Sequence, residues 1–349
     1  MNEQVSQKAE KVIGTAPALR SGLIGWLLRV TSILVILAAC VLIAFFAYQD
    51  LSGQSAVVSS DIESTDIESS DVESVVIKEV APEDAISADE VDLTSITSCI
   101  SQEIIDDAEH PLAPLLQMAK YGVGVINENV QDYTACITKR VRYQGRLQPE
   151  ERIFCKIRHA NDKDDSATPF SVYTRFINPK PGQEAIWVEG QYDDKLVAHG
   201  PTGFLNLLTV HLEPESKMAM TGNRYPIKTI GMLNLIKQMI KQGSNDINYE
   251  DCEVKITRNL MVNSARCTKL EVIHHKPADH FDFHRAEIYI DDDRNLPIAF
   301  RSFLWPDKPN GRPKLQESYY YTDIKINVGL TDADFDPANE KYEYPEAGL

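Results

Sequence analysis

Residues 132–159 read DYTACITKRVRYQGRLQPEERIFCKIRH, two stretches of alternating apolar and polar residues that are separated by turn-forming residues. Alternation with a period of two is typical of β-strands, and two such stretches around a glycine predict a hairpin. We expect strands over residues 133–143 and 151–159, joined by a turn at Gly145-Arg146. This hairpin indicates the fold class, because the chain that follows repeats the same pattern.

The expected turn also sets which residues lie opposite one another. With a turn at Gly145-Arg146, Cys136 faces Cys155. An oxidising compartment would permit a disulfide between these cysteines, and two buried reduced thiols are the alternative. The sequence therefore leaves this disulfide open.

Further strand patterns follow along the chain, and amphipathic helices accompany them. Apolar residues at three- and four-residue spacing predict helices over residues 111–130 and 230–240, the second ended by Gln242-Gly243-Ser244. The expected strands span residues 170–177, 184–189, 195–199, 205–212, 252–258, 266–273, 283–290, 298–305 and 315–326. This order is typical of an α+β domain with one large antiparallel sheet, which twists and curls when it has many strands. We expect the helices to cover the inner face of that curved sheet.

An apolar run near the N-terminus, Val30 to Tyr48, contains no charged residue. A helix of this length rises about 30 Å, the thickness of the hydrocarbon core of a bilayer. Basic residues precede the run and acidic residues follow it, which places residues 1–29 in the cytoplasm. We expect a single-pass signal anchor over residues 30–48, with the rest of the chain on the opposite side of the membrane.

Inside this run, Leu37-Ala38-Ala39-Cys40 has the form of a lipobox, which would leave a lipidated Cys40 as the new N-terminus. Apolar residues continue after Cys40, whereas a cleaved signal peptide has a shorter apolar core. The uncleaved anchor is therefore the favoured interpretation, and lipidation of Cys40 is the alternative. Either one attaches the chain to a membrane.

Most of the net charge of −17 lies between the apolar run and the strand-rich region. Residues 51–109 carry sixteen acidic residues against one basic residue, and residues 60–74 are three tandem repeats, SDIES, TDIES and SDVES. Such composition is typical of disorder, so we expect an acidic disordered tether over residues 49–109. Residues 110–349 are nearly neutral and long enough for a single domain, and their charge gives no reason to expect nucleic-acid binding. The basic residues of the first hairpin, Lys139 among them, alternate between its faces, so we expect a solvated edge there.

No nucleotide-binding loop, dinucleotide fingerprint, nucleophile elbow or metalloprotease helix motif occurs in the sequence, so we expect neither catalysis nor a cofactor. The feature closest to a metal site is HHKPADHFDFH at residues 274–284. On a strand, His280, Asp282 and His284 would share one face and could bind zinc. Lys276-Pro277 instead favours a solvated hairpin loop, which leaves a metal-dependent enzyme as the weaker alternative.

Five segments together resemble a known family: DYTACITKRV (132–141), PFSVYTRF (169–176), WVEG (187–190), AMTGNRYPI (219–227) and YYYTDIKINVGLTDADF (319–335). They are similar to an uncharacterised bacterial exported domain family, domain of unknown function 1571, over nearly all of residues 111–342. That family in turn resembles the outer-membrane lipoprotein carrier (LolA/LolB-like) superfamily. The resemblance implies a half-open barrel, which is a strongly curved antiparallel sheet with helices covering the concave face. It also implies a bacterial inner-membrane protein whose C-terminal domain lies in the periplasm.

In those carriers the concave face holds acyl chains, so Tyr173, Phe176 and Trp187 are candidate cavity-lining residues, although ordinary core packing is the favoured interpretation of these aromatic residues. We therefore expect a non-enzymatic, membrane-tethered envelope protein that binds a lipid, a lipoprotein acyl chain or another apolar ligand. A protein-interaction or sensor module with no small ligand is the second candidate, because a domain on a long tether is not a free shuttle. No protein partner can be named from the sequence.

Overall fold

The computed structural model describes residues 77–79, 96–161, 167–201 and 208–345. The predicted cytoplasmic segment (1–29), the membrane anchor (30–48), Cys40 and the acidic repeats lie outside the described residues. Among the residues that are described, no helix is both long enough and apolar enough to cross a membrane.

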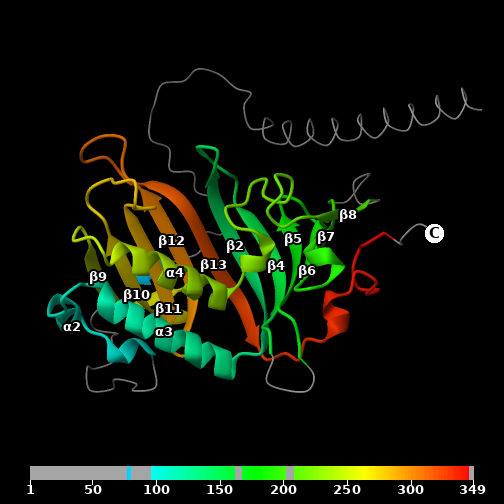
Figure 1. The fold of residues 1–349 in the computed structure, drawn as a ribbon, viewed down its shortest axis with the longest axis horizontal. Helices are drawn as coiled ribbons and strands as arrows, with labels where there is room; N and C mark the ends of the chain where they lie inside the picture. Colours follow the sequence, from blue (N-terminus) through cyan, green and yellow to red (C-terminus); the bar gives the residue numbers. More distant parts are fainter. Residues whose placement is uncertain (1–76, 80–95, 162–166, 202–207, 346–349) are drawn as a thin grey trace, which may run out of the picture. The chain divides into compact units, whose positions relative to one another are not determined.

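Thirteen strands form one antiparallel sheet in the part of the chain that the structure describes (Figure 1). Their order across the sheet is β1-β9-β10-β11-β12-β13-β2-β4-β5-β6-β7-β8, and β3 pairs with β2. The sheet is open, with β1 and β8 at its two edges. The strands are β1 (Ile77–Glu79), β2 (Asp132–Tyr143), β3 (Arg146–Leu147), β4 (Glu151–Arg158), β5 (Ser171–Asn178), β6 (Glu184–Val188), β7 (Leu196–His199), β8 (Thr209–Leu212), β9 (Glu253–Val262), β10 (Ala265–Ile273), β11 (Arg285–Asp291), β12 (Leu296–Leu304) and β13 (Lys314–Ile326).

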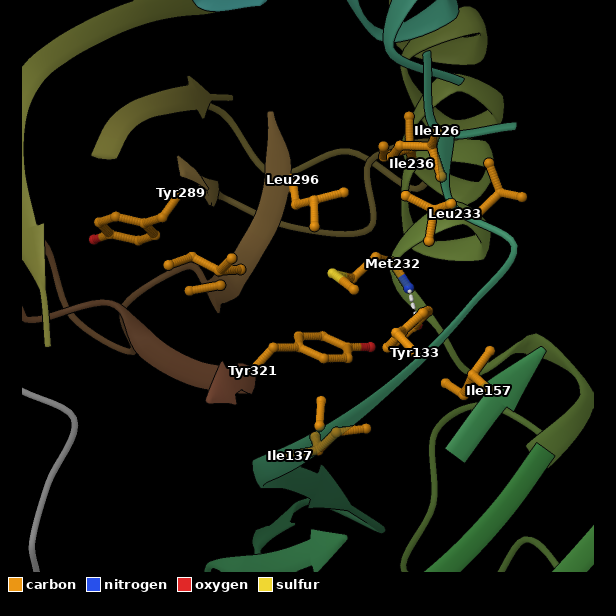
Figure 2. Packing of buried hydrophobic residues seen from close by; sticks show 14 of the residues in the cluster. Ile126, Tyr133, Ile137, Ile157, Met232, Leu233, Ile236, Tyr289, Leu296 and Tyr321 are labelled. Carbon is orange, nitrogen blue, oxygen red and sulfur yellow. Dashed lines mark hydrogen bonds between the residues drawn. The ribbon is translucent and has the colours of Figure 1, made fainter. Parts of the chain in front are cut away.

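Two long helices, α3 (Leu112–Asn129) and α4 (Met232–Asp246), lie across one face of the sheet (Figure 1). We call this the inner face and the opposite one the outer face. Buried side chains of α4, such as Met232 and Leu233, pack there against Tyr133 and Ile157 (Figure 2). The predicted fold class is confirmed: an α+β domain whose curved antiparallel sheet forms a half-open barrel with helices on the concave, inner face. The other helical segments are η1 (Ile96–Cys99), α2 (Gln102–Asp106), η2 (Tyr192–Asp194), η4 (Ile227–Thr229) and η5 (Asp332–Phe335).

Two glycines explain how closely α4 packs against β2 and against α3. Gly231, just before α4, has a φ of +119°, and a Cβ there would lie 3.0 Å from the Tyr133 hydroxyl oxygen. The same oxygen accepts a hydrogen bond from the Met232 amide at 3.0 Å (Figure 2). Gly243 does not end the helix as predicted; it lies inside α4, where a Cβ would meet Leu116 Cδ2 of α3 at 2.9 Å. Both positions therefore need the absence of a side chain.

The first hairpin is offset by one residue from the predicted register. Its turn lies at Gln144-Gly145, whose φ values of 48° and 79° are both positive, as in a type I′ turn. One extra residue between Leu147 and Glu151 then shifts the pairing of β4 with β2. Cys136 lies opposite Phe154, and Cys155 lies opposite Ala135. A slip of one residue sends a side chain to the other face of a sheet, so the two cysteines are on opposite faces. Both are free, and the predicted pairing of Cys136 with Cys155 is wrong.

The folded region begins before residue 110, where we expected the tether to end. Ile96, Ile100 and Ile105 are buried against apolar side chains of β9, β10 and β11. The Arg258 guanidinium donates hydrogen bonds to the carbonyl oxygens of Thr97, at 2.8 Å, and Ile100. The predicted tether over residues 49–109 is therefore too long, because apolar residues four and five apart can be buried even within an acidic stretch.

Candidate ligand-binding surface

The inner face is covered to different degrees along the sheet. One row of directly opposed residues crosses six strands: Ala135, Cys155, Thr174, Ala185, Ala198 and Val210. Its first three members are buried, Ala185 and Ala198 are half-buried, and Val210 is 37% exposed. Leu208, just before β8, is 46% exposed. The inner face therefore opens progressively from β5 towards the β8 edge.

This row consists of small side chains, and larger apolar side chains flank it. On one side, one larger residue from each of β2, β4, β5 and β6 lies opposite the next: Tyr133, Ile157, Val172 and Trp187. On the other side, Ile137, Ile153 and Phe176 are opposed across β2, β4 and β5. We call the part on β5–β8 the trough: a floor of Ala185, Ala198 and Val210 beside the walls of Trp187 and Phe176.

Trp187 is held rigidly in its wall. Its ring is almost fully buried, the indole Nε1–H donates to the Asp194 carbonyl oxygen at 3.1 Å, and the Phe170 ring lies 6.0 Å away between centroids. Asp194 ends a turn in which Tyr192, Asp193 and Asp194 all have positive φ values, of 52°, 57° and 58°. The structure thus places two of the candidate residues, Phe176 and Trp187, on the inner face.

Tyr173 does not share that face. Alternation along β5 directs it to the outer face, where its hydroxyl donates to Glu184 Oε1 at 2.7 Å and its ring stacks on Tyr342 at 4.3 Å. Burial raises the pKa of Tyr173 far above its ordinary value, and the Glu184 carboxylate adds to this rise. Tyr173 is therefore a core residue under the C-terminal segment, residues 328–345, and its proposed place beside Phe176 and Trp187 is wrong.

The carboxylate of Glu184 is the centre of this outer-face packing. His199 Nε2 lies 2.9 Å from Glu184 Oε2, and the Glu343 amide donates to the same oxygen at 3.0 Å. Burial alone would raise the pKa of Glu184, but hydrogen bonds from His199 and Tyr173 hold it below its ordinary value. These contacts fix the C-terminal segment to β5, β6 and β7.

A second polar cluster lies on the inner face, next to the Phe176 wall. The Lys139 ammonium is 2.7 Å from Glu151 Oε2 and donates to Asn223 Oδ1 at 2.6 Å. Lys180 Nζ is 3.5 Å from Glu151 Oε1 and 5.7 Å from the centroid of the Phe176 ring. Lys139 is buried, contrary to the solvated edge that we expected, because β13 and the segment around Asn223 enclose it.

The residues after Asn223 extend this cluster onto β13. Arg224 Nε lies 3.2 Å from Glu317 Oε2, and the Tyr225 hydroxyl donates to Glu317 Oε1 at 3.1 Å. Ser302 Oγ also donates to Glu317 Oε1, at 3.0 Å. Burial lowers the pKa of Lys139 and raises the pKa of Glu317. Sequence reasoning did not find this cluster, although Asn223, Arg224 and Tyr225 lie within one of the segments that carry the family resemblance.

The histidine-rich stretch does not form a metal site in the structure. His280 stacks on Tyr249, with centroids 3.6 Å apart, whereas His284 Nδ1 lies 2.7 Å from the His274 carbonyl oxygen. Strand β11 begins at Arg285, so His280, Asp282 and His284 do not share the strand face that the weaker alternative, a zinc site, required. In the part of the chain that the structure describes, no three His, Cys, Asp or Glu side chains come together to hold a metal ion.

Three solved structures are similar to this chain. A DUF1329 family protein from Desulfovibrio piger is 13% identical and gives a TM-score of 0.32, covering 63% of this chain and 97% of that chain. A domain described as an outer membrane lipoprotein-sorting protein, from Vibrio parahaemolyticus, is 11% identical with a TM-score of 0.28, covering 62% and 97%. A LolA superfamily protein from Nitrosomonas europaea is 11% identical with a TM-score of 0.25, also covering 62% and 97%.

The sequence comparisons are more specific. No curated protein matches the chain. A family model described as a protein of unknown function (DUF1571) matches residues 130–344, which include all the strands from β4 to β13 and the trough. Because this match spans more than half of the sequence, the chain belongs to the DUF1571 family.

Proposed function

We propose that this chain is a non-enzymatic, membrane-tethered protein of the bacterial envelope, and that the trough on its inner face binds the acyl chain of a lipid or a lipoprotein. The observation that carries the proposal is the trough itself. Its floor of Ala185, Ala198 and Val210 has smaller side chains than its walls, and the exposure of these residues increases towards the β8 edge.

The energetics favour an apolar ligand there. Moving a methylene group from water into an apolar environment contributes about 0.8 kcal/mol, so an acyl chain gains several kcal/mol by covering such a surface. Val210 and Leu208 lose solvent contact in the same event, which adds to the gain. Polar ligands would find few partners on this floor, since its side chains are alanine and valine.

The proposed tether comes from the sequence. The apolar run at residues 30–48 would hold the chain in the inner membrane, with residues 1–29 in the cytoplasm and the sheet domain in the periplasm. A protein fixed in this way would meet lipids or lipoproteins that leave or approach the membrane surface. It would act as a stationary receptor rather than a free shuttle.

Two neighbouring residues of β8 give a matched test. Val210 lies on the trough floor, and His211 points to the outer face; both are exposed. The full chain, purified from a bacterial envelope, is examined by native mass spectrometry and organic extraction for lipid that remains bound. We expect Val210→Glu to lose that lipid and His211→Glu to retain it, because only the first introduces a charge beneath the acyl chain. Equal lipid content in both variants, or none in the unchanged chain, would contradict the proposal.

A protein-interaction module is the second candidate, and one observation favours it. Strand β8 stands at the edge of the described sheet, with Leu208 and Val210 exposed beside its free backbone groups. Such an edge can add a strand from another chain. A chain without lipid that reproducibly binds a peptide, and loses it with a proline at Thr209, Val210 or His211, would favour this alternative.

A further inference from the structure

We propose that the ligand is an amphiphile with an anionic head, a carboxylate or a phosphate, and that Lys180 and Arg224, supported by Lys139, bind this head while the acyl tail lies in the trough. The inference rests on the proposed function, because it names the class of ligand for the same surface. The proposal is based on the contact between the polar cluster of the inner face and the apolar wall of the trough.

The cluster and the wall are continuous along β2, β4 and β5. Ile137 opposes Ile153, and the next inner-face pair along the same strands is Lys139 with Glu151. Phe176 opposes Ile153 from β5, and the Lys180 ammonium lies over the Phe176 ring. A ligand that passes along the trough towards Phe176 therefore meets cationic groups where the apolar surface ends.

The charges of the cluster do not cancel. It holds three cations, Lys139, Lys180 and Arg224, together with two carboxylates, those of Glu151 and Glu317. Glu151 is shared by both lysines, at 2.7 Å to Lys139 Nζ and 3.5 Å to Lys180 Nζ. The cluster therefore has an excess of positive charge, and an anion would balance it.

Two of the cations can be reached. The side chains of Lys180 and Arg224 are 36% and 30% exposed, whereas that of Lys139 is 9% exposed. A lysine ammonium has three N–H donors, and Glu151 is the carboxylate partner of Lys180 among the described residues. Hydrogen bonds from such cations to a carboxylate or a phosphate are stronger than neutral ones, and partial burial strengthens them.

The trough also sets the length of the tail. From β5 to β8 there are three steps between neighbouring strands, each about 4.8 Å, so the trough extends over about 14 Å across the strands. An extended acyl chain of about sixteen carbons covers this distance together with the stretch along β5 between Lys180 and the floor. A head group at Lys180 would then leave the end of the tail near Val210 at the open edge.

The test compares ligands that share one tail and differ in the head. The full chain, kept in a nonionic amphipol, is titrated with hexadecanoate, hexadecyl phosphate and hexadecan-1-ol, and the bound fraction is read by native mass spectrometry. We expect the two anionic probes to bind at least about tenfold more tightly than the alcohol, the ratio for one charged hydrogen bond. Lys180→Gln should lower this ratio towards one while leaving the affinity for the alcohol unchanged.

Lys195→Gln is the matched control. The Lys195 side chain is 35% exposed and also lies near two carboxylates, at 3.8 Å from Asp193 and 3.9 Å from Glu213, but it is not part of the cluster. Its removal should leave the ratio as it is. Arg224→Gln is the second variant, and near-UV circular dichroism confirms that each variant is folded.

Each remaining outcome is decisive. Equal affinity for the alcohol and the anions overturns the head site and leaves the proposed function standing. Failure to bind any of the three overturns both. Displacement of hexadecyl phosphate by inorganic phosphate, with no binding of the alcohol, would mean a site for free anions and overturn the amphiphile.

Discussion

Ile157 and Val210 lie on the same face of the same sheet, yet Ile157 is fully buried beside α4 and Val210 is 37% exposed at the β8 edge. The covered half of the inner face, β9–β13 with β2 and β4, carries large side chains that fill the space beneath α3 and α4. The open half, β5–β8, has alanine and valine along its floor. The comparison teaches that one face can be packed differently in its two halves: side chains in one half stabilise the fold, and the other half leaves exposed apolar surface, where we propose that a ligand binds.

The largest expected effect is a difference between the two halves in how much a substitution lowers the free energy of unfolding. Ile157→Ala should lower the free energy of unfolding by about 2–5 kcal/mol, because it leaves a cavity among well-packed side chains. Val210→Ala should change it by less than about 1 kcal/mol, since the side chain is already in contact with water. Urea titration of the full chain measures both. Similar losses in the two variants would mean that the open half is part of the core.

A second test addresses the close packing of α4 against β2 in the covered half. Gly231→Ala should destabilise the protein by about 1–3 kcal/mol, because a φ of +119° is unfavourable for alanine and the Cβ would press on the Tyr133 hydroxyl. Gly124→Ala, in α3, is the control: its Cβ would meet nothing within 4 Å, and alanine favours a helix by up to about 1 kcal/mol. Thermal unfolding compares the two. If both substitutions stabilise the chain, the close approach of α4 to β2 is not a constraint.

The outer face behind the open half is expected to respond to acid. The pKa of Glu184 is held below its ordinary value, so its contribution to stability is present above about pH 4.3 and is lost as the pH falls through the folded-state value. The slope is at most about 1.4 kcal/mol per pH unit for this one group. Urea unfolding between pH 7 and pH 3 should show a flatter dependence in Glu184→Gln. An unchanged slope in that variant would show that Glu184 does not cause the loss of stability in acid.

The smallest expected effect concerns reduction of the cysteines, which should leave the stability of the chain unchanged. Cys136 and Cys155 lie on opposite faces of the sheet, so dithiothreitol should leave the melting temperature of the oxidised, purified chain unchanged. A disulfide that closes a loop of this length would contribute about 3 kcal/mol. A clear fall in melting temperature on reduction would show that these strands pair in the predicted register after all.

Much of the architecture could be predicted from the sequence, because alternation and helical spacing report which side chains are buried. Both long helices and the antiparallel strands follow from those patterns. The register of β2 against β4 did not follow, since the β2–β3 pairs sum to 289 and the β2–β4 pairs sum to 290, and this one extra residue between Leu147 and Glu151 exchanges the faces.

The polar part of the site could not be predicted in the same way. Lys139, Arg224 and Glu317 are distant in sequence and meet only because β13 pairs with β2 and the residues around Asn223 reach both strands. Alternation says that Lys139 and Ile137 share a face, but not that this face is enclosed. For Tyr173 the opposite holds. The sequence indicated that this side chain is buried, but it did not indicate that the side chain lies on the outer face.

The most direct test of the central claim locates the tail of a bound ligand. A hexadecanoate that carries a photoreactive diazirine at the end of its tail is irradiated with the full chain, and the labelled peptides are mapped by mass spectrometry. The account predicts labelling on β6, β7 and β8 that Val210→Glu abolishes and His211→Glu leaves intact. Labelling confined to α3, α4 or the C-terminal segment, or labelling that Val210→Glu does not change, would contradict it.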